Sequence, residues 1–232
     1  MIGAIDRGAV AMQPPSGQRD GGVDLADEAD TAIIHVVDDD ASLRDALDSL
    51  LRSVGLRVRT WPSVREFLDG ERADVPGCLV LDVRLPGMSG LDFQAQLSDH
   101  GIHLPVVLMT GHGDIPMSVR GMKAGAIDFL TKPFRDQDML DAVAAAVARD
   151  RTRRETEDGL SEVRTRYATL SPREQQVMTL VTKGRLNKQV AGDLDLSEIT
   201  VKIHRGAAMR KMGARTLPDL VRMAEALAIS KA

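Results

Sequence analysis

One aspartate, Asp82, occupies a position that is typical of functional residues. It ends an apolar run at residues 78–81, and a turn segment containing glycine and proline follows at 84–90. An apolar run without helical spacing predicts a buried strand. Open α/β sheets bind their ligands at the carboxyl ends of the strands. A carboxylate at that place is therefore a candidate for ligand binding or catalysis.

Two further predicted strands also end in charged side chains. Residues 33–37 precede Asp38, Asp39 and Asp40, and residues 127–131 precede Lys132. With Asp82, these side chains would supply clustered carboxylates and one ammonium group, which suit a metal ion and a phosphoryl group. One of the three consecutive acids could instead cap the next helix, and Asp40 fits that role best.

Strand-like and helical segments alternate through the first half of the chain. Strands are expected at 33–37, around 56–60, and at 78–82, 105–109 and 127–131. Amphipathic helical segments lie between them, which predicts an α/β fold: a doubly wound parallel sheet with helices on both faces. In the flavodoxin-like strand order, the ends of strands one and three meet at the topological switch point. That order would bring Asp38 and Asp39 close to Asp82.

Composition is that of a globular protein with an uneven charge distribution. The 232 residues carry a net charge of −4, yet residues 151–232 hold 16 basic and 10 acidic side chains. This asymmetry indicates an acidic module joined to one with an anionic partner. No apolar run approaches the roughly 18 residues of a membrane span, and no secretory signal is expected. A single cysteine, Cys78, favours a reducing compartment, the cytoplasm.

Two segments lack a clear core pattern. Residues 1–30, with two basic and six acidic side chains, predict a disordered tail. The charged run 149–158 predicts a solvated helix or linker that continues the last helix of the first module. An apolar stripe resumes after it at Leu160, Val163 and Tyr167.

The C-terminal segment predicts a helix-turn-helix. A strong helix start is expected here, with Ser171 as N-cap, Pro172 at the first helical position and Glu174 three residues after the cap. That helix should end at Lys183 and Gly184. A short helix at 187–194, a turn at 195–197 and a longer basic helix at 198–212 follow.

These motifs together resemble a known family. Residues 31–150 resemble the receiver domains of two-component response regulators, and residues 168–228 resemble the LuxR-type helix-turn-helix of the NarL/FixJ class. The segments 110–114 and 132–134 are most similar to FixJ-type regulators. The resemblance divides the chain into a tail (1–30), a receiver domain (31–148), a helical linker (149–167) and a DNA-binding domain (168–232).

The resemblance assigns roles within the receiver. It implies that Asp82 accepts a phosphoryl group from a cognate sensor histidine kinase. Lys132 would pair with a phosphoryl oxygen, and Thr110 and Phe129 would form a switch. Arg84 and His112 would tune the lifetime of the phosphoryl-aspartate. The Mg²⁺ ligands would be Asp38, Asp39, Asp82 and the backbone carbonyl of Arg84.

The resemblance also implies a homodimer that forms on phosphorylation. The dimer would bind double-stranded DNA as a transcription factor, and RNA polymerase is a possible further partner. Ile199 and Val201 are expected to face inward. The candidate base-reading residues are Lys202, Ile203 and Arg205. The candidate phosphate contacts are Asn187, Lys188, Thr200 and Lys211.

Three other interpretations compete. A haloacid-dehalogenase-type phosphatase would need a second acid two residues after the nucleophile, where this chain has Arg84. A phosphate sink or kinase-binding adaptor would not need the basic helix at 198–212. A DNA-binding protein independent of phosphorylation would not need the acids, Thr110 and Lys132 together.

Overall fold

Five short segments form one parallel sheet in the computed structural model, which describes residues 32–111 and 115–229. The strands pair in the order β2-β1-β3-β4-β5, so β1 and β3 are neighbours. The predicted flavodoxin-like order is confirmed. The predicted tail at residues 1–30 lies outside the described residues. The strands are β1 (Ile33–Val37), β2 (Arg57–Trp61), β3 (Gly77–Asp82), β4 (Val106–Thr110) and β5 (Asp128–Thr131).

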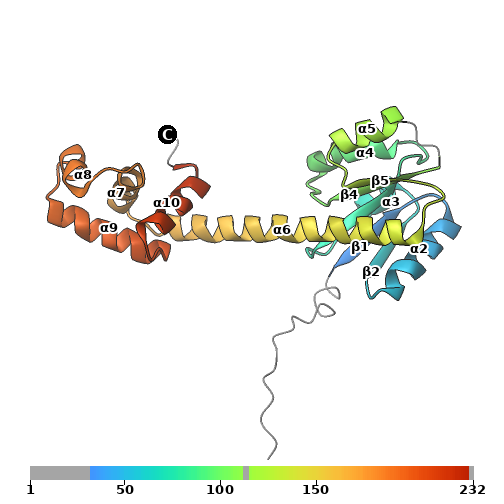
Figure 1. Ribbon diagram of the computed structural model, residues 1–232, viewed down its shortest axis with the longest axis horizontal. Helices are drawn as coiled ribbons and strands as arrows, with labels where there is room; N and C mark the ends of the chain where they lie inside the picture. Colours follow the sequence, from blue (N-terminus) through green and yellow to red (C-terminus); the bar gives the residue numbers. More distant parts are fainter. Residues whose placement is uncertain (1–31, 112–114, 230–232) are drawn as a thin grey trace, which may run out of the picture.

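Helices cover both faces of the sheet, as predicted (Figure 1). Alternation along β3 (period two) sends Cys78 and Val80 into one apolar core and Leu79 and Leu81 into the other. The first core is closed by α2 (Ala41–Ser53) and the start of α6 (Asp136–Ala168). The second is closed by α3 (Val64–Asp69), α4 (Gly90–Gln96), the 3₁₀ turn η1 (Leu97–His100) and α5 (Ile115–Lys123).

Four helices form the C-terminal domain. They are α7 (Pro172–Thr182), α8 (Asn187–Leu194), α9 (Glu198–Met212) and α10 (Leu217–Ala226). The predicted capping box of α7 is present, since Ser171 and Glu174 bond each other's backbone N–H groups. Gly184 and Gly213 follow α7 and α9 with positive φ, as the predicted stops require. The sequence analysis did not predict α10, although Thr216 and Asp219 form its capping box.

A single helix, α6, joins the two domains (Figure 1). Its first turns pack on the sheet through side chains such as Met139 and Val143. Near its end, Val163 and Tyr167 pack against the core of the C-terminal domain, and Arg166 donates to the carbonyl of Met212 at 3.0 Å. The charged segment is therefore helical throughout. Within the described residues, no helix is both long enough and apolar enough to cross a membrane.

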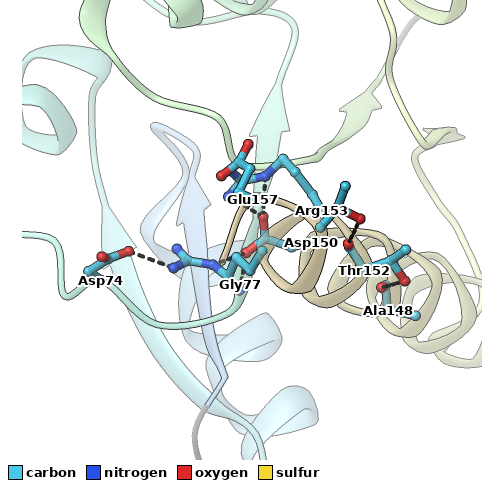
Figure 2. Close-up of polar contacts among 9 residues, drawn as sticks. Asp74, Gly77, Ala148, Asp150, Thr152, Arg153 and Glu157 are labelled. Atoms are coloured by element: carbon cyan, nitrogen blue, oxygen red, sulfur yellow. Dashed lines mark hydrogen bonds and ion pairs between the residues drawn. The ribbon is translucent and has the colours of Figure 1, made fainter. Parts of the chain in front are cut away.

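The charged segment is not wholly solvated, because one of its carboxylates is buried. Asp150 is 0% exposed and lies against the start of β3 (Figure 2). Its Oδ2 accepts the Gly77 N–H at 3.1 Å and the Nε–H of Arg154 at 2.9 Å. Its Oδ1 accepts from Arg153 at 2.8 Å. We call these four residues the α6 clamp, and they fix the helix where it leaves the sheet.

Close packing of the strands at the clamp also explains why residue 77 is a glycine. A Cβ at Gly77 would lie 2.2 Å from the carbonyl oxygen of Ile33, so a larger residue would push β1 and β3 apart. Arg154 extends the clamp by an ion pair to Asp74 in the loop before β3. The clamp thus joins two segments that are distant in sequence, α6 and the start of β3 with the loop before it.

Substituting Asp150 by alanine should destabilise the receiver domain by about 2–3 kcal/mol, because a buried N–H and two arginines would lose their partner. Urea unfolding can be followed by the fluorescence of Trp61, the chain's single tryptophan, which stacks on His35 in this domain. Glu155→Ala, at an exposed position one turn further along α6, is the matched control and should change stability by less than about 0.5 kcal/mol. Equal effects of the two substitutions would contradict the clamp.

Candidate functional sites

Three carboxylates meet at the carboxyl edge of the sheet. Asp38, Asp39 and Asp82 each offer an oxygen within 4.8 Å of the others. Asp38 and Asp82 are buried, and Asp39 is exposed. The strand order accounts for this meeting, because β1 and β3 are hydrogen-bonded neighbours whose last residues lie side by side.

Lys132 brings one positive charge to this cluster. Its Nζ lies 2.6 Å from Asp38 Oδ2 and 3.5 Å from Asp82 Oδ1, with the side chain 22% exposed. The backbone N–H of Lys132 donates to the carbonyl of Thr110 at 2.7 Å, which continues the pairing of β5 with β4. The predicted strand-end lysine therefore lies beside both buried carboxylates.

The loop after β1 is held by its own hydrogen bonds. The Asp40 carboxylate caps α2 by accepting from the N–H groups of Ser42 and Leu43, which confirms the predicted capping role. Asp38 Oδ1 accepts the N–H of Asp40 at 2.9 Å, and Arg44 donates to the Asp38 carbonyl at 2.7 Å. These contacts fix Asp38 before any ligand binds. The role of Arg44 was not predicted.

Asp82 lies in an electrostatically unfavourable place. Burial raises the pKa of Asp82 above its usual range, the Lys132 ammonium opposes this shift, and the Asp38 carboxylate adds to it. Among the residues that the structure describes, Asp82 Oδ1 is buried without a hydrogen-bond partner, since Lys132 approaches it only as an ion pair. An unbonded carboxylate oxygen beside two other carboxylates fits a small divalent cation that prefers oxygen ligands, such as Mg²⁺.

The remaining predicted residues of this domain lie on β4, on β5 and in the loop after β3. Thr110 ends β4 and is fully buried. Phe129 lies on β5 opposite Leu108, with its side chain partly buried in the second core. Arg84 follows Asp82 by two residues and has an exposed side chain. The predicted lifetime-tuning residue His112 lies outside the described residues.

Sequence reasoning missed a steric requirement at Gly90. A Cβ there would lie 2.1 Å from the carbonyl oxygen of Asp82. The first residue of α4 must therefore lack a side chain if the helix is to pack against the end of β3. The glycines within the turn after Asp82 were the sequence signal that could have indicated this requirement.

A second cluster of predicted residues lies on the helix-turn-helix formed by α8 and α9. Lys188, Lys202 and Ile203 are exposed. Arg205 donates to Asn187 Oδ1 at 3.2 Å, which links α9 to the start of α8. The Thr200 hydroxyl is 2.8 Å from that of Ser197, the N-cap of α9.

One prediction for α9 needs correction. Val201 is fully buried as expected, but Ile199 is 72% exposed and does not face inward. Residues two apart on a helix point in nearly opposite directions, so both could not enter one core. Lys211 lies in the last turn, where its Nζ is 2.6 Å from Glu174 Oε2 and 3.2 Å from the Thr169 carbonyl. These contacts position the Lys211 side chain at the end of α9, and its contact with a DNA phosphate stays a prediction.

The fold and these two sites define a regulator in which an acidic doubly wound domain is joined by a helix to a helix-turn-helix domain. Two family models match the chain: the response regulator receiver domain over residues 34–144, and the bacterial regulatory proteins of the luxR family over residues 168–224. The chain belongs to the response regulators that carry a LuxR-type DNA-binding domain.

Similar proteins share this two-domain organisation along most of their length. Nodulation protein W of Bradyrhizobium diazoefficiens is 59% identical over 204 residues, which cover 88% of this chain and 90% of that protein. Transcriptional regulatory protein FixJ of Azorhizobium caulinodans is 47% identical over 194 residues, covering 82% and 90%. The solved structure of the response regulator StyR has a TM-score of 0.74 at 45% identity, covering 84% of this chain and 98% of that one.

Removing the charge of Asp82 should stabilise the metal-free protein. A raised carboxyl pKa means that the folded state binds the proton more tightly than the unfolded state, so stability falls as pH rises through the folded pKa. Asp82→Asn should therefore raise the free energy of unfolding at pH 7 by about 1 kcal/mol without Mg²⁺. The gain should shrink at lower pH as the wild-type carboxyl takes up a proton.

Millimolar Mg²⁺ should make the wild type more stable than Asp82→Asn. Mass action should stabilise the wild type by about 1–3 kcal/mol and the variant by less. Urea unfolding followed by Trp61 fluorescence, with Mg²⁺ or with a chelator, measures both effects. Asp45→Asn, an exposed acid on α2, is the matched control and should respond to Mg²⁺ like the wild type. An equal Mg²⁺ effect in all three proteins would rule out the cluster as the binding site.

Proposed function

We propose that Asp82 is the phosphoacceptor of this response regulator and receives its phosphoryl group from a phosphohistidine of a cognate sensor histidine kinase. The unbonded Oδ1 of Asp82, beside two carboxylates and Lys132, carries this proposal. The P–N bond of the donor breaks as a P–O bond forms to Asp82. Later attack by water at phosphorus restores the carboxylate and releases inorganic phosphate.

Charge neutralisation explains the other side chains of the cluster. Asp38, Asp39, Asp82 and the Arg84 carbonyl would hold Mg²⁺, which when bound offsets the negative charge that accumulates as the phosphoryl group approaches. Lys132, already 3.5 Å from Asp82 Oδ1, is placed to pair with a phosphoryl oxygen as a point charge. Arg84 and His112 control the access of the hydrolytic water.

The switch proposal begins at the end of β4. Thr110 hydrogen-bonds the new phosphoryl oxygens and changes the packing of Phe129 on the neighbouring strand. The affected surface is formed by α5, β5 and the start of α6, and it becomes a homodimer interface. Support comes from α5, where Ile115, Val119 and Met122 are 80%, 44% and 46% exposed. Such an apolar helix face is typical of a surface that another protein covers.

The dimer presents two copies of the helix-turn-helix to a two-fold-related DNA site. Binding both half-sites raises affinity through effective concentration. We place α9 in the major groove, with Lys202, Ile203 and Arg205 at base edges. The contacts to DNA phosphates are assigned to Asn187, Lys188, Thr200 and Lys211.

The domain limits in this proposal are residues 31–148 for the receiver, 149–167 for the linker and 168–232 for DNA binding. The linker lies within α6, from the α6 clamp to the turn that packs on the C-terminal domain. The protein acts in the cytoplasm as a transcription factor, and RNA polymerase bound nearby on the DNA is a further partner.

Phosphorylation should convert the protein from monomer to dimer only when Asp82 is present. Wild type and Asp82→Ala would be incubated with Mg²⁺ and a small phosphodonor, and followed by intact-protein mass and light scattering. The wild type should gain one phosphoryl group and double its mass in solution, and Asp82→Ala should do neither. Incorporation of phosphate into Asp82→Ala would refute the assigned acceptor. A wild type that is phosphorylated yet stays monomeric would refute dimerisation in the absence of DNA.

DNA affinity should fall as salt rises, because lysine contacts to phosphates release counterions. Replacing Lys188 by alanine removes one phosphate contact from each protomer, so it should reduce the slope of log K against log salt by about two for the dimer. Arg65→Ala removes an exposed charge from the receiver and is the control that should leave the slope unchanged. Fluorescence anisotropy of a labelled duplex across a salt series measures the slope, and a flat dependence would contradict the phosphate contacts.

A further inference from the structure

The recognition surface of the helix-turn-helix carries large aliphatic side chains that no protein core covers. Ile199 and Ile203 are 72% and 64% exposed on α9, and Leu186, just before α8, is 69% exposed. In the described part of the C-terminal domain, these are the large hydrophobic side chains that are exposed. Ile199 and Ile203 are four residues apart, so they project from one face of the helix.

The polar side chains beside this aliphatic pair make the same face electropositive. Lys202 lies between the two isoleucines in sequence and is exposed. Arg205 is held by Asn187 on the same motif. The Thr200 hydroxyl is already engaged with Ser197 at the N-cap. An apolar pair bordered by cations suits an anionic partner that offers apolar groups, and the DNA major groove does so through the C5-methyl groups of thymine.

We propose that Ile199 and Ile203 contact thymine C5-methyl groups in the major groove, and that Ile199 is a specificity-determining residue. This inference rests on the proposed binding of α9 to DNA. Four residues of helix span about 6 Å, and bases on one strand are about 3.4 Å apart. The two side chains therefore address thymines separated by one or two base-pair steps.

The contact would give sequence preference without a hydrogen bond. Cytosine and the purines lack the C5-methyl group, so the apolar surface of an isoleucine would stay hydrated against them. Burying one methyl group is worth roughly a fourfold change in affinity. Two such contacts in each half-site of a dimer multiply to a substantial preference for thymine at fixed positions.

The test removes single methyl groups from the DNA. Preferred sites would first be selected from random duplexes with the full-length protein, Mg²⁺ and a small phosphodonor. Each thymine of the selected site would then be replaced by deoxyuridine, which lacks only the methyl group. The wild type should lose roughly fourfold in affinity at the contacted thymines. Ile199→Ala should lose its response at one of these positions, and Ile203→Ala at another.

Val54→Ala, which truncates an exposed aliphatic residue of the receiver, is the matched control and should respond to deoxyuridine like the wild type. Circular dichroism would confirm that each variant is folded. Unchanged wild-type affinity for every deoxyuridine duplex would overturn the inference and leave DNA binding intact. Variants that respond to deoxyuridine like the wild type would also overturn it. Failure to select any sequence would instead contradict the proposed function itself.

Discussion

The repulsion among three carboxylates at one edge of the sheet is the constraint on which the receiver depends. Folding forces Asp38, Asp39 and Asp82 together, and Lys132 offsets only part of their charge. The pKa of Asp82 is raised chiefly by burial, so the folded state has an unfavourable charge where the chemistry occurs. Two apolar cores, one on each face of the sheet, supply the stability that offsets the electrostatic cost of this cluster. The proposed Mg²⁺ would offset this repulsion.

Local signals made much of the fold predictable. Apolar strand segments, charged strand ends and helix caps are properties of a few neighbouring residues, so the strands, their charged ends and the ends of α7, α8 and α9 follow from them. The strand order and the acidic cluster followed from the flavodoxin-like topology that the alternation of strands and helices predicts. Interactions between distant segments were not accessible in this way. Asp150 lies in a charged run that resembles a solvated helix, and its burial depends on Gly77, 73 residues earlier. Gly90 likewise shows its role only when α4 is packed on β3.

The error at Ile199 has a different cause. Hydrophobicity alone suggested that Ile199 faces inward, although helical geometry allows only one of Ile199 and Val201 to do so. Val201 fills the core between α7, α8 and α9, which leaves Ile199 in solvent. An exposed aliphatic residue on a basic helix is better explained by a partner than by the fold. The helix α10 was missed for a simpler reason, because its Thr216 and Asp219 capping signal was not weighed.

The two ends of β3 have different roles. One end holds the proposed phosphoacceptor, and the other contacts the helix that leads to the DNA-binding domain. Asp82 ends this strand at the acidic edge, whereas Gly77 begins it at the α6 clamp. The helix α6 starts beyond Lys132 at the acidic edge, runs back along the sheet and leaves it at Asp150 (Figure 1). A kinase that approaches Asp82 therefore meets an edge from which the DNA-binding domain is absent. Asp82 and α9 are thus connected through one strand, β3, and one helix, α6.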